Sequence, residues 1–172
     1  DEFGTSVAVS GNVAIVGARL NDANGSNAGQ AKIFRFDGTS WNFEAEFFGD
    51  ASSDRFGESV AISGDVAIVG ALLNDVNGTD AGQVKIFRFD GTSWNFEAEF
   101  FGDAASDRFG KSVAISGDVA IVGARNNDTN GTNAGQVKIL DAPLLTRTDE
   151  IRYLVSPDNS IISATATIGL QG

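Results

Sequence analysis

The sequence is organised around a segment that occurs three times at a constant spacing. Each copy begins with a Phe-Gly dipeptide, at Phe3, Phe56 and Phe109, so the period is 53 residues (56 − 3 = 53 and 109 − 56 = 53). A fixed period of this length is typical of a repeat architecture, in which each copy folds as one supersecondary unit and packs on its neighbours. The repeat therefore constrains the fold more than any other feature of the chain.

Each copy contains four segments with the pattern of short β-strands, which in the first copy are residues 5–10, 13–18, 30–36 and 41–48. A two-residue turn with Gly first joins the first two segments, and this order favours a type II′ turn. A loop rich in Asn, Asp and Gly separates the second segment from the third. Val, Ile, Phe and Thr are plentiful, and they favour strands over helices.

Four antiparallel strands in about fifty residues is the size of one β-propeller blade. A solenoid of stacked hairpins is the alternative, although solenoid repeats are generally shorter. We therefore predict an all-β fold made of tandem four-stranded antiparallel β-propeller-type blades, with three repeats of 53 residues and a C-terminal β tail. The expected boundaries are blade 1 at 1–55, blade 2 at 56–108, a partial blade 3 at 109–143 and the tail at 144–172.

The third and fourth strands of a copy can be aligned across the turn that joins them. In this register Phe36 faces Trp41 and Phe34 faces Phe43, and such cross-strand aromatic pairs stabilise a sheet. Strict alternation adds Phe47 to this aromatic face. The other face is expected to be solvated and to carry Ile33, Arg35, Asn42, Glu44 and Glu46, with Arg35 in reach of Glu44.

The copies share the motif Phe-Gly-x-Ser-Val-Ala-[Val/Ile]-Ser-Gly-[Asn/Asp]-Val-Ala-Ile-Val-Gly-Ala, followed after the polar loop by Ala-Gly-Gln-[Ala/Val]-Lys-Ile. This pattern, over residues 3–139, resembles FG-GAP repeats, the blades of the integrin α-subunit β-propeller and of many bacterial extracellular proteins. The resemblance implies four-stranded blades, an extracellular or cell-surface location, and a role in adhesion or scaffolding.

Two departures from the family pattern bear on calcium. Many members continue Gly-Ala with Pro, whereas Arg19, Leu72 and Arg125 follow it here. Calcium-binding members also carry an Asp-x-Asp-x-Asp-Gly loop between the first two strands. The corresponding turn has only two residues here, which cannot supply the six or more oxygen ligands that calcium takes.

The polar loop after the second strand offers another place for a metal. A calcium site there would draw on Asp22, Asn24, Asp75, Asn77, Asp80 and Asp128. Leu20 stands where a first carboxylate is expected, however, and no Glu closes the loop. We favour a turn in which Asn and Asp side chains bond to their own backbone. We therefore predict no cofactor, with calcium as the alternative.

The same loop carries an Asn-x-Ser/Thr acceptor for N-linked glycans in every copy. The acceptors are Asn24, Asn77 and Asn130, and the third copy adds Asn127. Asn-Gly-Thr is also favourable turn chemistry, so both interpretations stay open.

Composition excludes several classes of function. The net charge of −11 and the pI near 4.2 argue against nucleic acid or an anionic membrane as a partner. The chain has no Cys and no His, so it has no thiol nucleophile, disulfide or imidazole base. Alternation places the pairs Glu44/Glu46 and Glu97/Glu99 each on one outward face rather than across a cleft, so no enzyme activity is predicted. No apolar run is long enough for a transmembrane helix, so no membrane insertion is expected.

The third copy ends differently from the others. Leu140-Asp141-Ala142-Pro143 replaces Phe-Arg-Phe-Asp, and the Trp-Asn-Phe-Glu strand does not follow. The tail has an expected strand at 151–155 and a β-branched, uncharged run at 160–170. We expect this tail to add a strand either to its own blade or to a neighbour's. The residues expected to mediate assembly are Ile161, Ile162, Ala164, Ala166, Ile168 and Leu170.

Three blades are fewer than the four to eight that usually close a propeller, so both ends of the stack stay open. We therefore predict a non-enzymatic extracellular structural protein that binds copies of itself head to tail, giving a homo-oligomer or filament. The alternative is a fragment of a larger adhesion or ligand-binding propeller, with glycans or cell-surface ligands as partners.

Overall fold

The computed structural model describes residues 1–141, 150–155 and 161–165. These residues form strands and no helix. The strands are β1 (Phe3–Ser10), β2 (Val13–Ala18), β3 (Gln30–Phe36), β4 (Trp41–Phe48), β5 (Phe56–Ser63), β6 (Val66–Ala71), β7 (Gln83–Phe89), β8 (Trp94–Phe101), β9 (Phe109–Ser116), β10 (Val119–Ala124), β11 (Gln136–Asp141), β12 (Glu150–Val155) and β13 (Ile161–Thr165).

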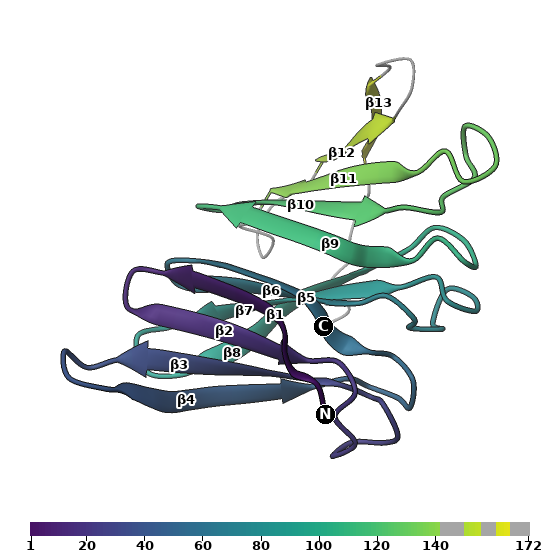
Figure 1. Cartoon of the computed structure of the whole chain (residues 1–172). Helices are drawn as coiled ribbons and strands as arrows, with labels where there is room; N and C mark the ends of the chain where they lie inside the picture. Colours follow the sequence, from purple (N-terminus) through teal and green to yellow (C-terminus); the bar gives the residue numbers. More distant parts are fainter. Residues whose placement is uncertain (142–149, 156–160, 166–172) are drawn as a thin grey trace, which may run out of the picture.

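The strands form three antiparallel sheets, one for each repeat. Blade 1 has the order β1-β2-β3-β4 and blade 2 the order β5-β6-β7-β8, while blade 3 has five strands in the order β9-β10-β11-β12-β13. The inner strand β5 lies against both β1 and β9, and the three sheets are stacked in chain order (Figure 1). The predicted all-β fold of tandem four-stranded blades is confirmed.

The first hairpin of every blade closes with the predicted turn. Gly11, Gly64 and Gly117 have φ angles of 57°, 55° and 58°, and each lies directly after a paired Ser. The Asn or Asp that follows each glycine keeps a negative φ, so the turns are of the II′ type. Glycine adopts the positive φ at the first turn position without steric cost.

The aromatic pairs of the outer hairpin also form as predicted. Phe36 pairs with Trp41 and Phe34 with Phe43 across β3 and β4, with ring centroids 5.5 Å and 6.3 Å apart. Arg35 Nε donates to Glu44 Oε1 at 2.6 Å. The copy in blade 2 repeats both aromatic pairs.

The prediction that Phe47 extends this aromatic face is wrong, because β4 contains a bulge. Phe34 pairs with Phe43 but Ile33 pairs with Ala45, so one extra residue of β4 lies between these two pairs. A β-bulge of this kind interrupts the alternation of faces. As a result, Phe47 points to the opposite side from Phe43 and stacks on Phe87 of blade 2, with ring centroids 3.7 Å apart.

The same bulge divides the carboxylate pair, and the face expected to be solvated lies against blade 2, where Ile33 is fully buried. Glu44 is turned toward blade 2, where its Oε2 accepts a hydrogen bond from Trp94 Nε1 at 3.1 Å. Glu46 lies on the other side and accepts from Gln30 Nε2 at 2.9 Å. The two carboxylates therefore lie on opposite faces of the sheet rather than on one.

The hydrophobic core lies between the blades, in one cluster for each pair of neighbours. Blades 1 and 2 each have an aromatic face on the side of β1 and β5 that points back along the stack and an aliphatic face toward the following blade, and in blade 3 Leu140 replaces the Phe87 of blade 2. In blade 2 the aromatic face includes Phe87 and Trp94, and the aliphatic face includes Ile68 and Ile86. The interface between blades 1 and 2 therefore joins an aliphatic face to an aromatic one, whereas blade 3 contributes Phe109 and otherwise aliphatic side chains to the second interface.

Candidate interaction surfaces

The Phe-Gly dipeptide of each later blade inserts into the blade before it, and we call it the Phe-Gly plug. Phe56 and Phe109 are fully buried, and their backbone N–H groups donate to the carbonyl oxygens of Ala28 and Ala81 at 2.9 Å and 3.0 Å. The plug glycines pass so close to the receiving strand that a Cβ at Gly70 would lie 2.1 Å from the carbonyl oxygen of Gly110. The repeated glycines therefore serve close backbone approach between blades.

The plug has a specific backbone conformation that recurs in all three copies. The residue before Phe has a positive φ, 56° at Arg55 and 54° at Arg108, and the plug glycines have φ angles of 88° and 83°. In the first copy Glu2 has a φ of 50° and Gly4 a φ of 95°, although none of the described blades receives this plug. Phe3-Gly4 thus adopts the conformation of a docked plug at a free end of the stack.

Serine side chains join the inner strands of neighbouring blades. Ser6 Oγ accepts from the backbone N–H of Val60 at 3.0 Å, and Ser63 Oγ accepts from that of Gly117 at 2.9 Å. Ser59 Oγ donates instead to the carbonyl oxygen of Gly110 at 2.7 Å. The serines of the repeated motif therefore contribute to contacts between blades.

A single carboxylate connects all three blades. Glu58 in blade 2 binds Arg19 of blade 1 at 3.1 Å and also Lys111 of blade 3, and its side chain is only 5% exposed. Burial raises the pKa of Glu58, but the hydrogen bonds from Lys111 and Arg19 outweigh burial and hold the pKa below its usual value. Its counterparts in the other copies are Thr5 and Lys111, so this clamp exists once.

An Asp–Lys pair repeats at the two interfaces, and an Arg–Asp pair is added at the second. Asp50, in the link after blade 1, pairs with Lys85 of blade 2, and Asp103 pairs with Lys138 of blade 3 at 2.6 Å. Arg88 of blade 2 reaches Asp118 of blade 3 at 3.3 Å. These pairs fix the orientation of neighbouring blades as well as their contact.

At the two ends of the stack the corresponding faces are exposed. Trp41 on the aromatic face of blade 1 is 48% exposed, whereas its counterpart Trp94 is 7% exposed. Ile121 on the aliphatic face of blade 3 is 40% exposed, whereas Ile68 is fully buried. Blade 1 thus presents an uncovered aromatic face and blade 3 an uncovered aliphatic face.

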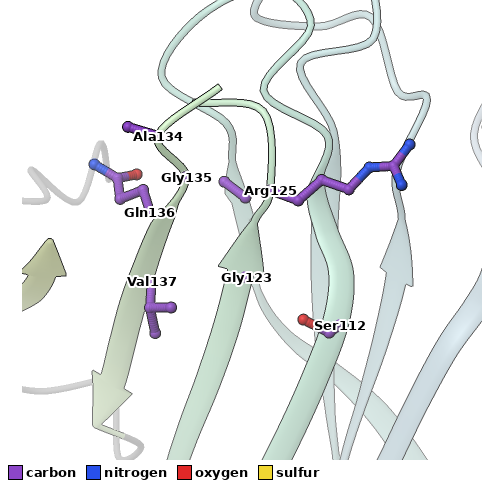
Figure 2. Close-up of a pocket in the computed structure, with 8 residues that line it drawn as sticks. Ser112, Gly123, Arg125, Ala134, Gly135, Gln136 and Val137 are labelled. Carbon is purple, nitrogen blue, oxygen red and sulfur yellow. The ribbon is translucent and has the colours of Figure 1, made fainter. Parts of the chain in front are cut away.

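The open face of blade 3 is hollowed in two places. One hollow, of about 330 Å³, is lined by residues that include Ser112, Gly123 and Val137, which lie side by side on β9, β10 and β11 (Figure 2). The other, of about 280 Å³, lies over the apolar side chains of the same sheet, including Val119 and Ile121.

The polar loops have the geometry of side-chain-stabilised turns. Asp22 Oδ1 accepts from the backbone N–H of Asn27 at 2.7 Å, and Asp75 and Asp128 accept from residues 80 and 133 in the same way. Asn24 and Asn77 donate to the carbonyl oxygens of the links at Gly49 and Gly102. Asp80 also lies 3.8 Å from Arg108. No three acidic residues come together in the part of the chain that the structure describes.

The predicted glycan acceptors divide into two groups. Asn24, Asn77 and Asn130 are exposed in equivalent loops. Asn127 is buried, and its Nδ2 donates to Asp107 Oδ2 at 2.8 Å. Its counterpart Asn74 binds Asp54 at 3.1 Å in the same way, so this position holds the loop against the preceding link. A buried amide of this kind is not accessible to modification, so only the exposed group is suited to carry glycans.

The tail adds two strands to its own blade. β12 pairs antiparallel with β11, and β13 pairs with β12, so β12 takes the place that β4 and β8 hold in the other blades. Of the residues expected to mediate assembly, Ile161, Ile162 and Ala164 lie in β13, and Ala166, Ile168 and Leu170 lie outside the described residues.

A family model for the FG-GAP repeat matches residues 1–34, 44–87 and 96–139. The chain belongs to the FG-GAP repeat family. The second FG-GAP match begins in β4 and ends in β7, so the sequence unit of the family straddles two blades. No curated protein matches the chain. Among the described residues, no helix is long and apolar enough to cross a membrane.

Proposed function

We propose that this FG-GAP chain is a non-enzymatic extracellular structural protein that stacks head to tail on further copies of itself. One observation carries the proposal. The aromatic face exposed on blade 1 and the aliphatic face exposed on blade 3 correspond to the two halves of the interface between blades 1 and 2. The partner that fits each end is therefore the opposite end of a second copy.

The exposed faces are large enough to drive association. Blade 1 exposes five large apolar side chains on β1 and β4, the first and last strands of its sheet. They are Phe3, Val7, Val9, Trp41 and Phe43. Contiguous apolar patches of this kind on a soluble protein mark interaction sites. Because two different faces join, the contact is heterologous, and it gives a ring where the rotation closes and a filament where it does not.

Association can be measured by sedimentation velocity across a range of protein concentrations, with electron microscopy of the largest species. We expect concentration-dependent assembly of the full chain. The substitutions Val7→Asp and Val119→Asp should each weaken it by about tenfold or more, because each buries a charge in an apolar contact. Val76→Asp is the matched control, since Val76 is 64% exposed in a polar loop away from both faces.

A chain that stays monomeric at every concentration would contradict head-to-tail stacking. That result would favour the second candidate, in which these blades form part of a larger adhesion propeller and a neighbouring blade of the same polypeptide covers each face.

The extracellular part of the proposal rests on the family, because FG-GAP repeats typically occur in extracellular proteins. The exposed sequons at Asn24, Asn77 and Asn130 fit a glycan coat on the loops. Secretion from a eukaryotic host followed by glycosidase treatment should lower the mass, and Asn127→Gln should leave the glycan mass unchanged. An unmodified secreted protein would remove glycans from the proposal.

A further inference from the structure

We propose that the larger hollow on blade 3 is a binding site for a Phe-Gly plug, and that its occupant is Phe3-Gly4 of a second copy. We call this site the socket, and it is formed by Ser112, Gly123, Gly135, Gln136 and Val137. The inference rests on the head-to-tail stacking proposed above and adds the residues that make the joint.

In blade 2 the place that corresponds to the socket is already filled. The counterparts of Gly123 and Gly135 are Gly70 and Gly82, where an added Cβ would lie 2.1 Å from the carbonyl oxygen of Gly110 and 2.2 Å from that of Phe109. In blade 3 a Cβ at Gly123 would approach only Ser112 closely, at its Oγ, and a Cβ at Gly135 would meet nothing nearer than 3.4 Å. The socket therefore has the shape of an occupied site without the plug.

The polar groups of an occupied site are also present. The carbonyl oxygens of Ala28 and Ala81 accept from the N–H of each docked Phe, and Ala134 stands at the same position beside the socket (Figure 2). Ser59 donates to the carbonyl oxygen of Gly110, and Ser112 is its counterpart in blade 3. A bound plug would thus find a backbone acceptor where both internal plugs find it, and a hydroxyl donor where the plug of blade 3 finds Ser59.

The occupant is preorganised at the other end of the chain. Besides sharing the φ angles of the docked plugs, the first copy closes the same local turn, in which Thr5 N donates to the Glu2 carbonyl at 3.1 Å and Glu58 N to the Arg55 carbonyl at 3.1 Å. The Phe3 ring lies 6.4 Å from Phe34, edge to face, as Phe56 lies 6.4 Å from Phe87. Binding therefore requires little ordering, which lowers its entropic cost.

The geometry selects a second copy rather than the chain's own plug. Blade 2 lies between blades 1 and 3, and the first and third sheets lie at opposite ends of the stack (Figure 1). The plug of one chain is therefore available to the socket of another, and repetition of the joint extends the stack in one direction.

Two substitutions test the joint from its two sides in the full chain. Gly123→Ala places a methyl group where the carbonyl of the incoming glycine would lie, while within its own chain it requires only that the Ser112 hydroxyl rotate. Phe3→Ala removes the plug ring. In sedimentation experiments each variant should weaken self-association by about tenfold or more, while the dilute monomer stays folded and its melting temperature falls by no more than a few degrees.

Mixing the two variants separates a blocked joint from a damaged fold. Gly123→Ala keeps its plug and Phe3→Ala keeps its socket, so an equimolar mixture should give discrete 1:1 dimers that do not extend. The plug and socket would be overturned if the mixture failed to dimerise. They would also be overturned if Phe3→Ala weakened self-association and Gly123→Ala did not.

The outcomes also separate this inference from stacking itself. If both variants associate like the unsubstituted chain while Val119→Asp does not, stacking stands and the plug is wrong. If the unsubstituted chain is monomeric throughout, both proposals fall.

Discussion

Strands β4 and β8 have the same eight residues, Trp-Asn-Phe-Glu-Ala-Glu-Phe-Phe, but lie in different surroundings. Trp41 at the start of β4 is half exposed, and Trp94 at the start of β8 is buried under blade 1. Both strands carry the same bulge and the same aromatic pair. Local conformation therefore follows the local sequence, whereas burial depends on whether a neighbouring blade is present.

A neighbouring blade covers only part of the face of a sheet. Phe43 and Phe96 are exposed to nearly the same degree, 57% and 56%, although only Phe96 has a blade in front of its sheet. The blades therefore touch most closely along their inner strands. Residues near β1, β5 and β9 should carry most of the difference between a covered and an uncovered blade.

The largest expected difference is between Phe56→Ala and Phe3→Ala in the dilute monomer. Phe56 is fully buried between two blades, so its truncation should lower the free energy of unfolding by about 3–5 kcal/mol. Phe3 is 55% exposed, so the same change there should cost much less, about 1 kcal/mol or below. Urea denaturation of both variants measures the difference, and equal losses would mean that the first plug is covered in the monomer.

A smaller effect is expected at the carboxylate that joins the blades. Glu58→Gln keeps the shape and removes the charge that Arg19 and Lys111 bind, which should cost about 1.5–3 kcal/mol at neutral pH. Because the folded pKa of Glu58 lies below its ordinary value of 4.5, the contribution is complete above that value and is lost as the pH falls through the folded pKa.

The free energies of unfolding of Glu58→Gln and of the unsubstituted chain, plotted against pH, should therefore converge in acid. Glu46→Gln is the matched control, because Glu46 and Lys32 are 3.6 Å apart and each about a third exposed. It should change stability by less than about 0.5 kcal/mol. A constant gap between Glu58→Gln and the unsubstituted chain down to acid pH would contradict the assigned role.

The smallest effect concerns the two tryptophans themselves. Trp94→Phe removes the N–H that Glu44 accepts at 3.1 Å across the blade interface, and the expected cost is about 1 kcal/mol. Trp41→Phe should be nearly neutral in the monomer because no blade faces it. Chemical denaturation monitored by far-ultraviolet circular dichroism compares them without relying on the indole signal, and a larger loss at Trp41 would reverse the comparison.

Much of this architecture can be predicted from the sequence because it depends on local pattern. The period locates the blades, the Gly-first turns locate the hairpins, and alternation gives the pairs Phe34–Phe43 and Phe36–Trp41. The bulge could not be predicted, because Phe-Glu-Ala-Glu-Phe alternates perfectly and gives no sign of an extra residue in β4. Missing the bulge also assigned Phe47 and Glu46 to the wrong sides of the sheet.

The contacts between blades depend on sequence positions that no local pattern brings together. The sequence gives only a weak indication of the clamp at Glu58, because the three copies differ at this position and have Thr, Glu and Lys there. The sequence gives a clearer indication that Asn127 is buried. Asn21 and Asn74 occupy the same position without forming a sequon, and in every copy the side-chain oxygen at this position accepts from the backbone N–H two residues on.

The offset between the family's sequence unit and the sheets affects how the chain can change in length. Residues 32–51 are identical to residues 85–104, so removing 53 residues that start anywhere within this stretch yields one and the same product. The junction falls inside β3, β4, their turn or the first residues of the link after β4, in a sequence that already folds there, and the product keeps the first plug and the last socket. Blade number can therefore vary while the ends stay constant, and under the proposed head-to-tail stacking, chains of different lengths would join in a single mixed polymer.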